Sequence, residues 1–396
     1  MSGKKELELY IHIPFCVRKC LYCDFLSFPA GRQAQAEYMD QLRCEIISSG
    51  PWYAGSEVST VFIGGGTPSA LESEQITLLM QAVYRAFSVA ENAEITIEAN
   101  PGTRLAAKLP AYRKAGINRL SLGLQSVCND ELKHLGRIHS FDDFLMGFQQ
   151  ARMAGFSNIN IDLMSGIPGQ NVESWKNTLR KVIMLKPEHI SAYSLIIEEG
   201  TPFGTHYMPS QEEKTDVLSG WPPLMSEEED RQIYHLTKTI LAEAGFLRYE
   251  ISNYARQGYE CRHNIGYWTG KDYLGFGLGA SSCVSGCRFC NEKDLRRYME
   301  YDFSAGELEE LHGDVHRQSR KEQMEEFMFL GLRMMGGVSD IRFFREFGVH
   351  MESIYGEVIR KLEENGLLLK EGGTVRLSDW GIDVSNYVLG EFLLEL

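Results

Sequence analysis

Residues 7–23 of the chain read LELYIHIPFCVRKCLYC and place three cysteines just after a strand-like run, Leu7–Ile13. Cys16, Cys20 and Cys23 have the spacing C-x3-C-x2-C, and a helical pattern begins beyond them. Three thiolates at this spacing can bind three of the four irons of a 4Fe-4S cubane. The fourth iron then lacks a protein ligand and stays open to a substrate, as in catalytic metal sites. The segment therefore predicts an iron–sulfur cluster with one open iron.

Other metal sites are alternatives to this interpretation. A zinc ion at the same triplet would need a fourth ligand, which Asp24 or His12 could supply only awkwardly, so we favour the cluster. A second triplet, Cys283, Cys287 and Cys290, repeats the spacing but follows glycine-rich sequence. We interpret it as coincidence and leave a second metal centre open. Cysteines clustered in this way are typical of metal ligation in a reducing compartment rather than of disulfides.

Strand-like and helix-like segments alternate over residues 7–200. The strand-like segments are Leu7–Ile13, Val58–Ile63, Glu94–Glu98, Arg119–Leu124, Asn158–Leu163 and His189–Leu195. The helix-like segments include Ala34–Ser48, Glu74–Ser88, Phe141–Ala154 and Glu173–Leu185. This alternation predicts parallel strands with right-handed crossovers. Polar or glycine motifs lie at or near the carboxyl ends of these strands, where parallel barrels build their sites. We therefore predict a partial parallel (β/α)6 TIM-like barrel.

The sequence pattern changes twice after this core. Residues 1–205 form the predicted barrel, and residues 206–310 a polar linker with an α+β extension, in which Leu247–Tyr254 is predicted to be one strand. Residues 311–396 show amphipathic helices and then a hairpin pattern, GLLLKEGGTVRLS, which predicts a small winged-helix-like domain. Residues 341–396 hold 6 Lys and Arg against 10 Asp and Glu, a net charge of −4. This acidic balance favours a structural or docking role over nucleic-acid binding.

The whole composition indicates a soluble protein. The formal net charge is −14 and no basic block stands out, which disfavours binding to phosphate backbones. No stretch approaches the ~18 apolar residues that a membrane span needs, and the N-terminal sequence is unlike a signal peptide. We expect a cytoplasmic location and no membrane span, with peripheral contact to membrane-bound partners left open.

Several motifs together resemble the radical S-adenosylmethionine (SAM) family, in particular its coproporphyrinogen III oxidase-like group. Besides the first cysteine triplet they are YIHIPFC at 10–16, GGTP at 65–68, EANPG at 98–102, GLQS at 123–126, LGRIH at 135–139 and DLMSGIPG at 162–169. The resemblance covers almost the whole chain. It implies a 4Fe-4S cluster on Cys16, Cys20 and Cys23 whose open iron binds SAM. It also implies that SAM is surrounded by Tyr10, Tyr22, Gly65, Gly66, Thr67, Glu98, Gln125, Arg137 and Asp162.

The chemistry of these residues suits that role. Arg137 can form a fork onto the SAM carboxylate. Asp162 or Glu98 can accept hydrogen bonds from ribose hydroxyls or the ammonium, and Gln125 can donate or accept. Glycines after a strand let backbone groups approach a ligand closely.

The resembled group contains both an oxygen-independent coproporphyrinogen III oxidase and haem chaperones. The oxidase motif continues to a fourth cysteine, and Phe25 stands at that position here. The oxidase also carries an extension before the first strand, and we expect none here. Residues 263–268, HNIGYW, match the HNxxYW motif of the chaperones, which implies that His263 contacts haem beside Tyr267 and Trp268. We predict a haem chaperone that delivers haem to haem-requiring proteins. The oxidase is the alternative, and SAM cleavage and the identity of the recipient stay open.

Overall fold

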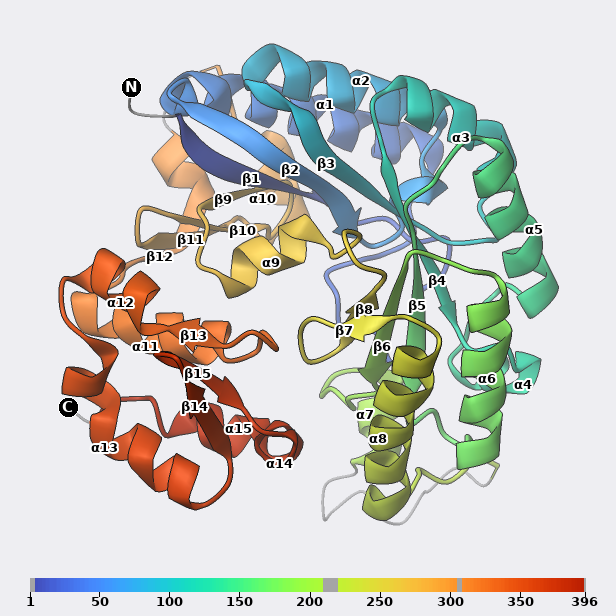
Figure 1. The fold of residues 1–396 in the computed structure, drawn as a ribbon. Helices are drawn as coiled ribbons and strands as arrows, with labels where there is room; N and C mark the ends of the chain where they lie inside the picture. Colours follow the sequence, from blue (N-terminus) through green and yellow to red (C-terminus); the bar gives the residue numbers. More distant parts are fainter. Residues whose placement is uncertain (1–3, 209–219, 305–307, 395–396) are drawn as a thin grey trace.

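The computed structural model describes residues 4–208, 220–304 and 308–394. Its main feature is a curved mixed sheet, whose twelve strands within these ranges run in the order β12-β11-β10-β9-β1-β2-β3-β4-β5-β6-β8-β7. The order ends on β12 at one side and on β7 at the other, so the barrel is open (Figure 1). The predicted partial α/β barrel is confirmed.

Six parallel strands in sequence order form the centre of the sheet. They are β1 (Lys5–Ile13), β2 (Ser56–Gly65), β3 (Val89–Ala99), β4 (Arg119–Gln125), β5 (Ile159–Ser165) and β6 (His189–Ser194). Each predicted strand segment overlaps one of them. In β1 the alternate residues Leu9, Ile11 and Ile13 are fully buried. Parallel pairing brings the carboxyl ends of all six strands to one rim, and this rim carries the motifs.

A layer of helices covers the outer face of these strands (Figure 1). The helices are α1 (Arg32–Ser49), α2 (Ser73–Ala86), α3 (Leu105–Lys114), α5 (Phe141–Met153), α6 (Val172–Met184) and α8 (Glu227–Glu243). Their apolar faces join the strands in one core, to which α6 contributes the buried Trp175. The sequence pattern does not indicate α3 because Pro110 lies inside it, nor the short α4 (Asn129–His134).

Strands from the extension continue the barrel sheet on the side of β1. β9 (Tyr273–Phe276) pairs in parallel with β1, with Leu274 opposite Leu9. β10 (Ser281–Val284), β11 (Cys287–Asn291) and β12 (His312–Arg317) follow as antiparallel strands. The sheet therefore runs on to Arg317, beyond the residue 311 at which we placed the last domain. The short α10 (Leu295–Glu300) lies between β11 and β12.

The other edge of the sheet differs from the prediction. The segment Leu247–Tyr254, predicted as one strand, breaks into β7 (Leu247–Arg248) and β8 (Asn253–Ala255). The two strands pair with each other as a hairpin, in which the Ser252 amide donates to the Glu250 carboxylate at 3.0 Å. The predicted single strand is therefore wrong. Helix α7 (Pro202–Tyr207) crosses the predicted boundary at residue 205, and residues 209–219 of the linker lie outside the described ranges.

The C-terminal part has a core of its own beside the barrel (Figure 1). It consists of α11 (Arg320–Gly331), α12 (Asp340–Phe347), α13 (Met351–Glu364), β13 (Val338–Ser339), β14 (Leu368–Glu371), β15 (Thr374–Leu377), α14 (Asp379–Asp383) and α15 (Ser385–Gly390). The three strands pair in the order β13-β15-β14, so the predicted winged-helix-like arrangement is confirmed. None of the helices in the described ranges has the length and apolar character needed to cross a membrane.

Candidate cofactor and ligand site

The three cysteines of the first triplet lie on the loop that joins β1 to α1. Backbone hydrogen bonds anchor this loop, from the Cys16 amide to the Phe28 carbonyl at 3.1 Å and from the Phe28 amide to the Pro14 carbonyl at 2.9 Å. The thiols are partly exposed. Burial raises the pKa of Cys23, and the neighbouring Cys20 and Cys16 add to that rise. The fold therefore places the three thiols on one loop at the carboxyl end of the first strand.

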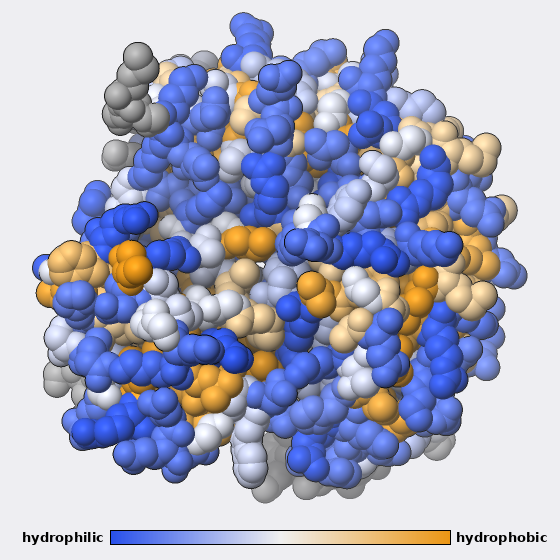
Figure 2. Space-filling model, in the orientation of Figure 1, coloured by the Kyte–Doolittle hydropathy of each residue, from blue (hydrophilic) through white to orange (hydrophobic). Residues whose placement is uncertain are grey.

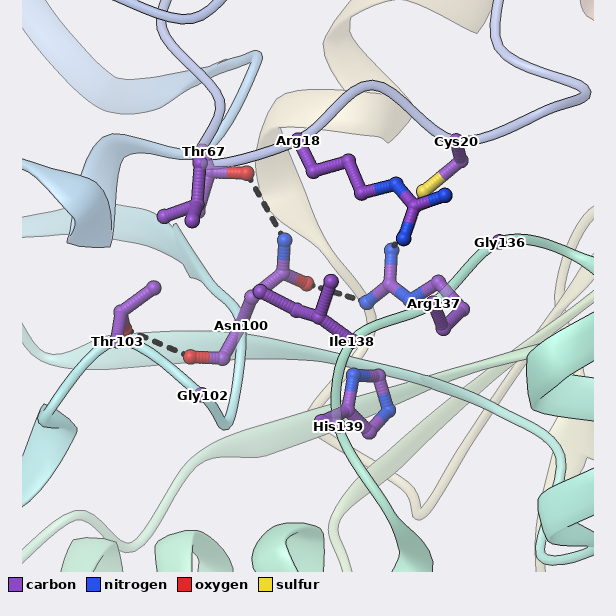
Figure 3. A pocket seen from close by; sticks show the side chains of 11 residues that line it. Arg18, Cys20, Thr67, Asn100, Gly102, Thr103, Gly136, Arg137, Ile138 and His139 are labelled. Carbon is purple, nitrogen blue, oxygen red and sulfur yellow. Dashed lines mark hydrogen bonds between the residues drawn. The ribbon is translucent and has the colours of Figure 1, made fainter.

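A chain of hydrogen bonds links this loop to the ends of three further strands (Figure 3). The Sγ atom of Cys16 lies 3.5 Å from Thr67 Oγ1 after β2, and Asn100 Nδ2 after β3 donates to the same Thr67 oxygen at 2.9 Å. Arg137 Nη2 donates to Asn100 Oδ1 at 2.6 Å and to the Gly123 carbonyl of β4 at 2.9 Å. Its Nη1 lies 3.7 Å from the Sγ of Cys20. Arg137 therefore ties the cysteine loop to β3 and β4.

Two glycines of the GGTP motif create room at this rim. Gly65 has a φ of +106°, which favours glycine, and a Cβ there would collide with the imidazole of His12. A Cβ on Gly66 would lie 2.7 Å from the Phe15 carbonyl oxygen. The amide of Gly65 donates to Glu98 Oε2 at 3.1 Å. The glycines are therefore required for the close packing of β2 against the cysteine loop.

Two carboxylates and one amide lie inside the barrel mouth. Burial raises the pKa of Glu98 to about 8, and the neighbouring Asp162 adds to the rise. Burial also raises the pKa of Asp162, although its carboxylate accepts from Ser121 Oγ at 2.9 Å and from Asn160 Nδ2 at 2.7 Å. Gln125, with a φ of +67°, has a buried Oε1 without a hydrogen-bond partner among the described residues. A buried unpaired acceptor is costly, and a bound ligand with a donor group would satisfy it.

The two tyrosines of the predicted set occupy different places. The hydroxyl of Tyr10 lies 3.1 Å from His12 Nδ1 at the barrel mouth. Tyr22 packs near Phe203, with ring centroids 6.4 Å apart, and burial raises its pKa while Arg137 opposes the rise. Tyr22 therefore contacts the arginine that ties the rim together.

These residues fit a 4Fe-4S cluster and SAM by their donor chemistry. In the described ranges no three Cys, His, Asp or Glu side chains lie close enough together to bind one metal ion. A cubane holds its cysteines on different irons, so three separated thiols on one loop are compatible with it. The orphaned oxygen of Gln125, the carboxylate of Glu98 and the glycine gap at Gly65 supply a lining that suits a zwitterionic, hydroxyl-rich ligand.

The site missed by the sequence prediction is centred on Asn100. Its side chain joins Thr67 to Arg137, and its backbone amide donates to Ser69 Oγ at 3.0 Å. The signal was available, because Asn100 lies in the EANPG motif that follows β3. Glu98, which the same motif predicts, accepts from the Gly65 amide, whereas Asn100 lies at the centre of the network.

A large cleft of about 1280 Å³ adjoins this rim. Tyr10, His12, Gly65 and Glu98 line it on the barrel side, and residues of α11 and α12 line it on the side of the C-terminal domain. Aromatic walls come from Tyr267, Trp268, Tyr273 and Phe327. Figure 2 shows pale and orange residues around a hollow near the middle of this face, close to the position of α9 (Arg262–Trp268) in Figure 1. The cleft therefore connects the predicted SAM site with the C-terminal domain.

The structure does not place His263 where haem iron could bind it. Its side chain is 1% exposed, and its Nδ1 and Nε2 atoms lie 2.7 Å from Thr60 Oγ1 and 2.9 Å from the Tyr267 hydroxyl. Its ring stacks on Phe62 at 5.2 Å, and burial lowers its pKa to about 3. Both ring nitrogens are engaged, so the predicted direct haem contact is corrected. The residues of the motif that do line the cleft are Tyr267 and Trp268.

The second cysteine triplet lies on the β10–β11 hairpin. Cys283 pairs with Arg288, and Val284 pairs with Cys287. Because neighbouring residues of a strand point to opposite faces, Cys283 and Cys287 lie on different faces of the hairpin. Cys290 is buried and donates to the Gly279 carbonyl at 3.2 Å. This geometry favours the interpretation of the second triplet as coincidence.

Comparisons with known proteins agree with this geometry. The family model of the radical SAM superfamily matches residues 10–182, and the model of the HemN C-terminal domain matches residues 318–384. The chain resembles coproporphyrinogen III oxidase (HemN) from Escherichia coli in structure, with a TM-score of 0.83, 24% identity and coverage of 100% of this chain and 92% of that one. The fold and the cysteine loop thus define a radical SAM protein.

Sequence relatives narrow the family further. The heme chaperone HemW of Bacillus subtilis is 37% identical over 388 residues, which is 98% of this chain and 99% of that protein. The heme chaperone HemW of Escherichia coli is 40% identical over 70% of each chain. The chain belongs to the HemW family of radical SAM proteins.

Proposed function

We propose that the protein binds haem in the cleft beside the barrel mouth and delivers it to haem-requiring proteins. The observation that carries this proposal is the cleft itself, about 1280 Å³ in volume, between the predicted SAM site and the C-terminal domain. Typical small-molecule pockets measure ~300–1,000 Å³, so this space is large enough for a ligand in addition to SAM. The names of the relatives support haem as the ligand class.

The cleft walls suit a flat, apolar ring system. The guanidinium carbon of Arg333 lies 4.4 Å from the centroid of the Trp268 ring. Tyr267 packs edge-on against Tyr273, with ring centroids 4.7 Å apart. These contacts hold the aromatic side chains in place, so less conformational freedom is lost when a ligand binds. Aromatic faces of this kind stack favourably on a macrocycle.

The cofactor assignments belong to the same proposal. Cys16, Cys20 and Cys23 hold a 4Fe-4S cluster, and the rim residues around Arg137 and Gln125 hold SAM. When bound, the cluster supplies a redox-active iron with an open coordination position beside SAM. Arg137 and Asn100 keep the cysteine loop against the strand ends. The proposed location is the cytoplasm, and the haem-requiring recipients stay unspecified.

The second candidate function is decarboxylation of coproporphyrinogen III. It is favoured by the opening of the cleft onto Glu98 and Gly65, which would bring a tetrapyrrole next to SAM. Against it, the position of the fourth oxidase cysteine is Phe25, whose side chain is 61% exposed at the cleft.

One anaerobic experiment separates the two functions. The cluster is reconstituted in the full chain, and the same sample is titrated with haemin and assayed with coproporphyrinogen III, SAM and a reductant. We expect one haemin per chain and no decarboxylated product. Ser281→Trp serves as the blocking variant, because Ser281 is an exposed β10 residue that lines the cleft. Product formation would support the oxidase. If Ser281→Trp bound haemin as tightly as the wild type, haem would bind outside the cleft and the proposed site would be wrong.

A further inference from the structure

Helix α12 carries two arginines into the cleft. Arg342 and Arg345 both line it, and both side chains are exposed. Residues three apart on a helix share one face, so the two guanidinium groups point to the same side. The buried Phe343 and Phe347 of the same helix fix α12 in the core of the C-terminal domain.

The other cations that line the cleft are already paired. Lys5 pairs with Asp272, Lys271 with Glu6, and Arg288 with Glu326. An ion pair of this kind has little remaining attraction for an anionic ligand. An unpaired cation for such a ligand therefore has to come from another element of the cleft.

Arg342 and Arg345 differ from those three cations. Arg342 Nη2 reaches only a backbone carbonyl, that of Thr269, at 3.3 Å, and its guanidinium lies 5.5 Å from the Phe327 ring centroid. Arg345 has no hydrogen-bond or ion-pair partner within the described ranges. Glu346 also lies at the cleft. It points about 100° away from Arg345 and about 40° away from Arg342 around the helix, and it forms no ion pair with either arginine within the described ranges. In a chain of net charge −14, two unneutralised cations facing a cleft provide a local attraction for an anion.

We propose that Arg342 and Arg345 bind the propionate carboxylates of the tetrapyrrole, so that the C-terminal domain sets the orientation of the ligand in the cleft. The inference rests on the proposed function. A guanidinium forms charge-assisted, bidentate hydrogen bonds with a carboxylate. With the carboxylates at α12, the ring lies toward Trp268 and Tyr267, and its far edge faces the barrel mouth.

The test compares haemin with haemin dimethyl ester, which has the same ring without the negative charges. Dissociation constants are measured with the full chain for the wild type, Arg345→Gln, Arg342→Gln and the control Arg360→Gln. Arg360 is exposed on α13 of the same domain and does not line the cleft. Far-UV circular dichroism checks that each variant is folded.

We expect the wild type to bind haemin about a hundred-fold more tightly than the ester, because the ester loses two charge-assisted contacts that contribute about ten-fold each. Arg345→Gln should bind haemin about ten-fold more weakly and the ester unchanged, and Arg360→Gln should match the wild type. Equal affinity of the wild type for haemin and the ester would overturn the carboxylate site and leave the proposed haem binding in place. If neither ligand binds, the proposed function fails together with it.

Discussion

The Nε2 atom of His263 lies 2.9 Å from the hydroxyl oxygen of Tyr267, one helical turn further along α9. Nδ1 of the same ring is held by Thr60 of β2 at 2.7 Å. The imidazole is therefore a buried link between the barrel and the aromatic wall of the cleft. We interpret the HNxxYW motif as a support for Tyr267 and Trp268 rather than as a source of an iron ligand.

This interpretation makes a spectroscopic prediction. His263→Gln should bind haem several-fold more weakly because Tyr267 loses its hydrogen bond, which is worth about 1 kcal/mol. The Soret band of the bound haem should stay at its wild-type wavelength, since the axial ligand is unchanged. Tyr267→Phe should have the same effect on affinity. A shifted Soret band in His263→Gln, with a wild-type band in Tyr267→Phe, would restore His263 as the ligand.

Gln125 should affect SAM binding and stability in opposite directions. Its buried Oε1 has no hydrogen-bond partner among the described residues, so Gln125→Met removes an unsatisfied acceptor and should stabilise the SAM-free protein by about 1 kcal/mol. The same change removes the proposed contact to SAM and should weaken SAM binding about ten-fold. Calorimetric titration and thermal unfolding measure the two effects. Unchanged SAM affinity would exclude Gln125 from the site.

The cluster should depend on the first cysteine triplet alone. Cys20→Ala should lose nearly all of the cubane absorbance after reconstitution, because two thiolates do not hold the cluster. Cys287→Ala is the matched control, since Cys287 has the same place in the second triplet and lies on the opposite face of its hairpin from Cys283. Iron and sulfide content per chain provides the measurement. Equal loss of iron in the two variants would contradict the assignment.

Glu8 should make the stability of the protein fall as the pH rises. Its side chain is fully buried without a hydrogen-bond partner among the described residues, and burial raises its pKa from 4.5 to about 8. The unfolded chain releases this proton near pH 4.5, whereas the folded protein retains it up to about pH 8. The folded state is therefore destabilised across that interval, by at most about 1.4 kcal/mol per pH unit.

Glu8→Gln tests this pH dependence because glutamine has no proton to release. The stability of the variant relative to the wild type should increase from pH 5 to pH 8 in urea unfolding experiments. Glu57→Gln, at an exposed position of β2, is the control and should show no such trend. A constant difference between Glu8→Gln and the wild type at all pH values would show that Glu8 is not protonated in the folded state.

The barrel and its rim could be predicted from sequence because their signals are local. Each of the six central strands alternates with a helix, and a chemical motif such as GGTP or the cysteine triplet lies directly at a strand end. Parallel pairing then brings those motifs together without further information. Asn100 was overlooked because an uncharged side chain reveals its role only through partners that are distant in sequence, Thr67 and Arg137.

The position of His263 and the course of the extension depend on contacts that the sequence pattern does not report. A motif match identifies a histidine but not the burial of its ring against Phe62 and Thr60. The pairing of β9 with β1 joins residues more than two hundred positions apart, and no periodicity predicts such a register. The hairpin of β7 and β8 replaces one strand because the chain turns at Glu250–Ser252.

The transfer of haem from the full chain to an acceptor tests the central claim most directly. The reconstituted protein is loaded with one equivalent of haemin, freed of excess ligand and mixed with apomyoglobin, and the Soret spectrum of the acceptor is followed. Ser281→Trp, which narrows the cleft, is treated in the same way. We predict that the wild type retains haem on its own and transfers it to apomyoglobin, while Ser281→Trp retains none. Haem that fails to bind the wild type, or that binds Ser281→Trp equally well and is transferred from it, would contradict the account.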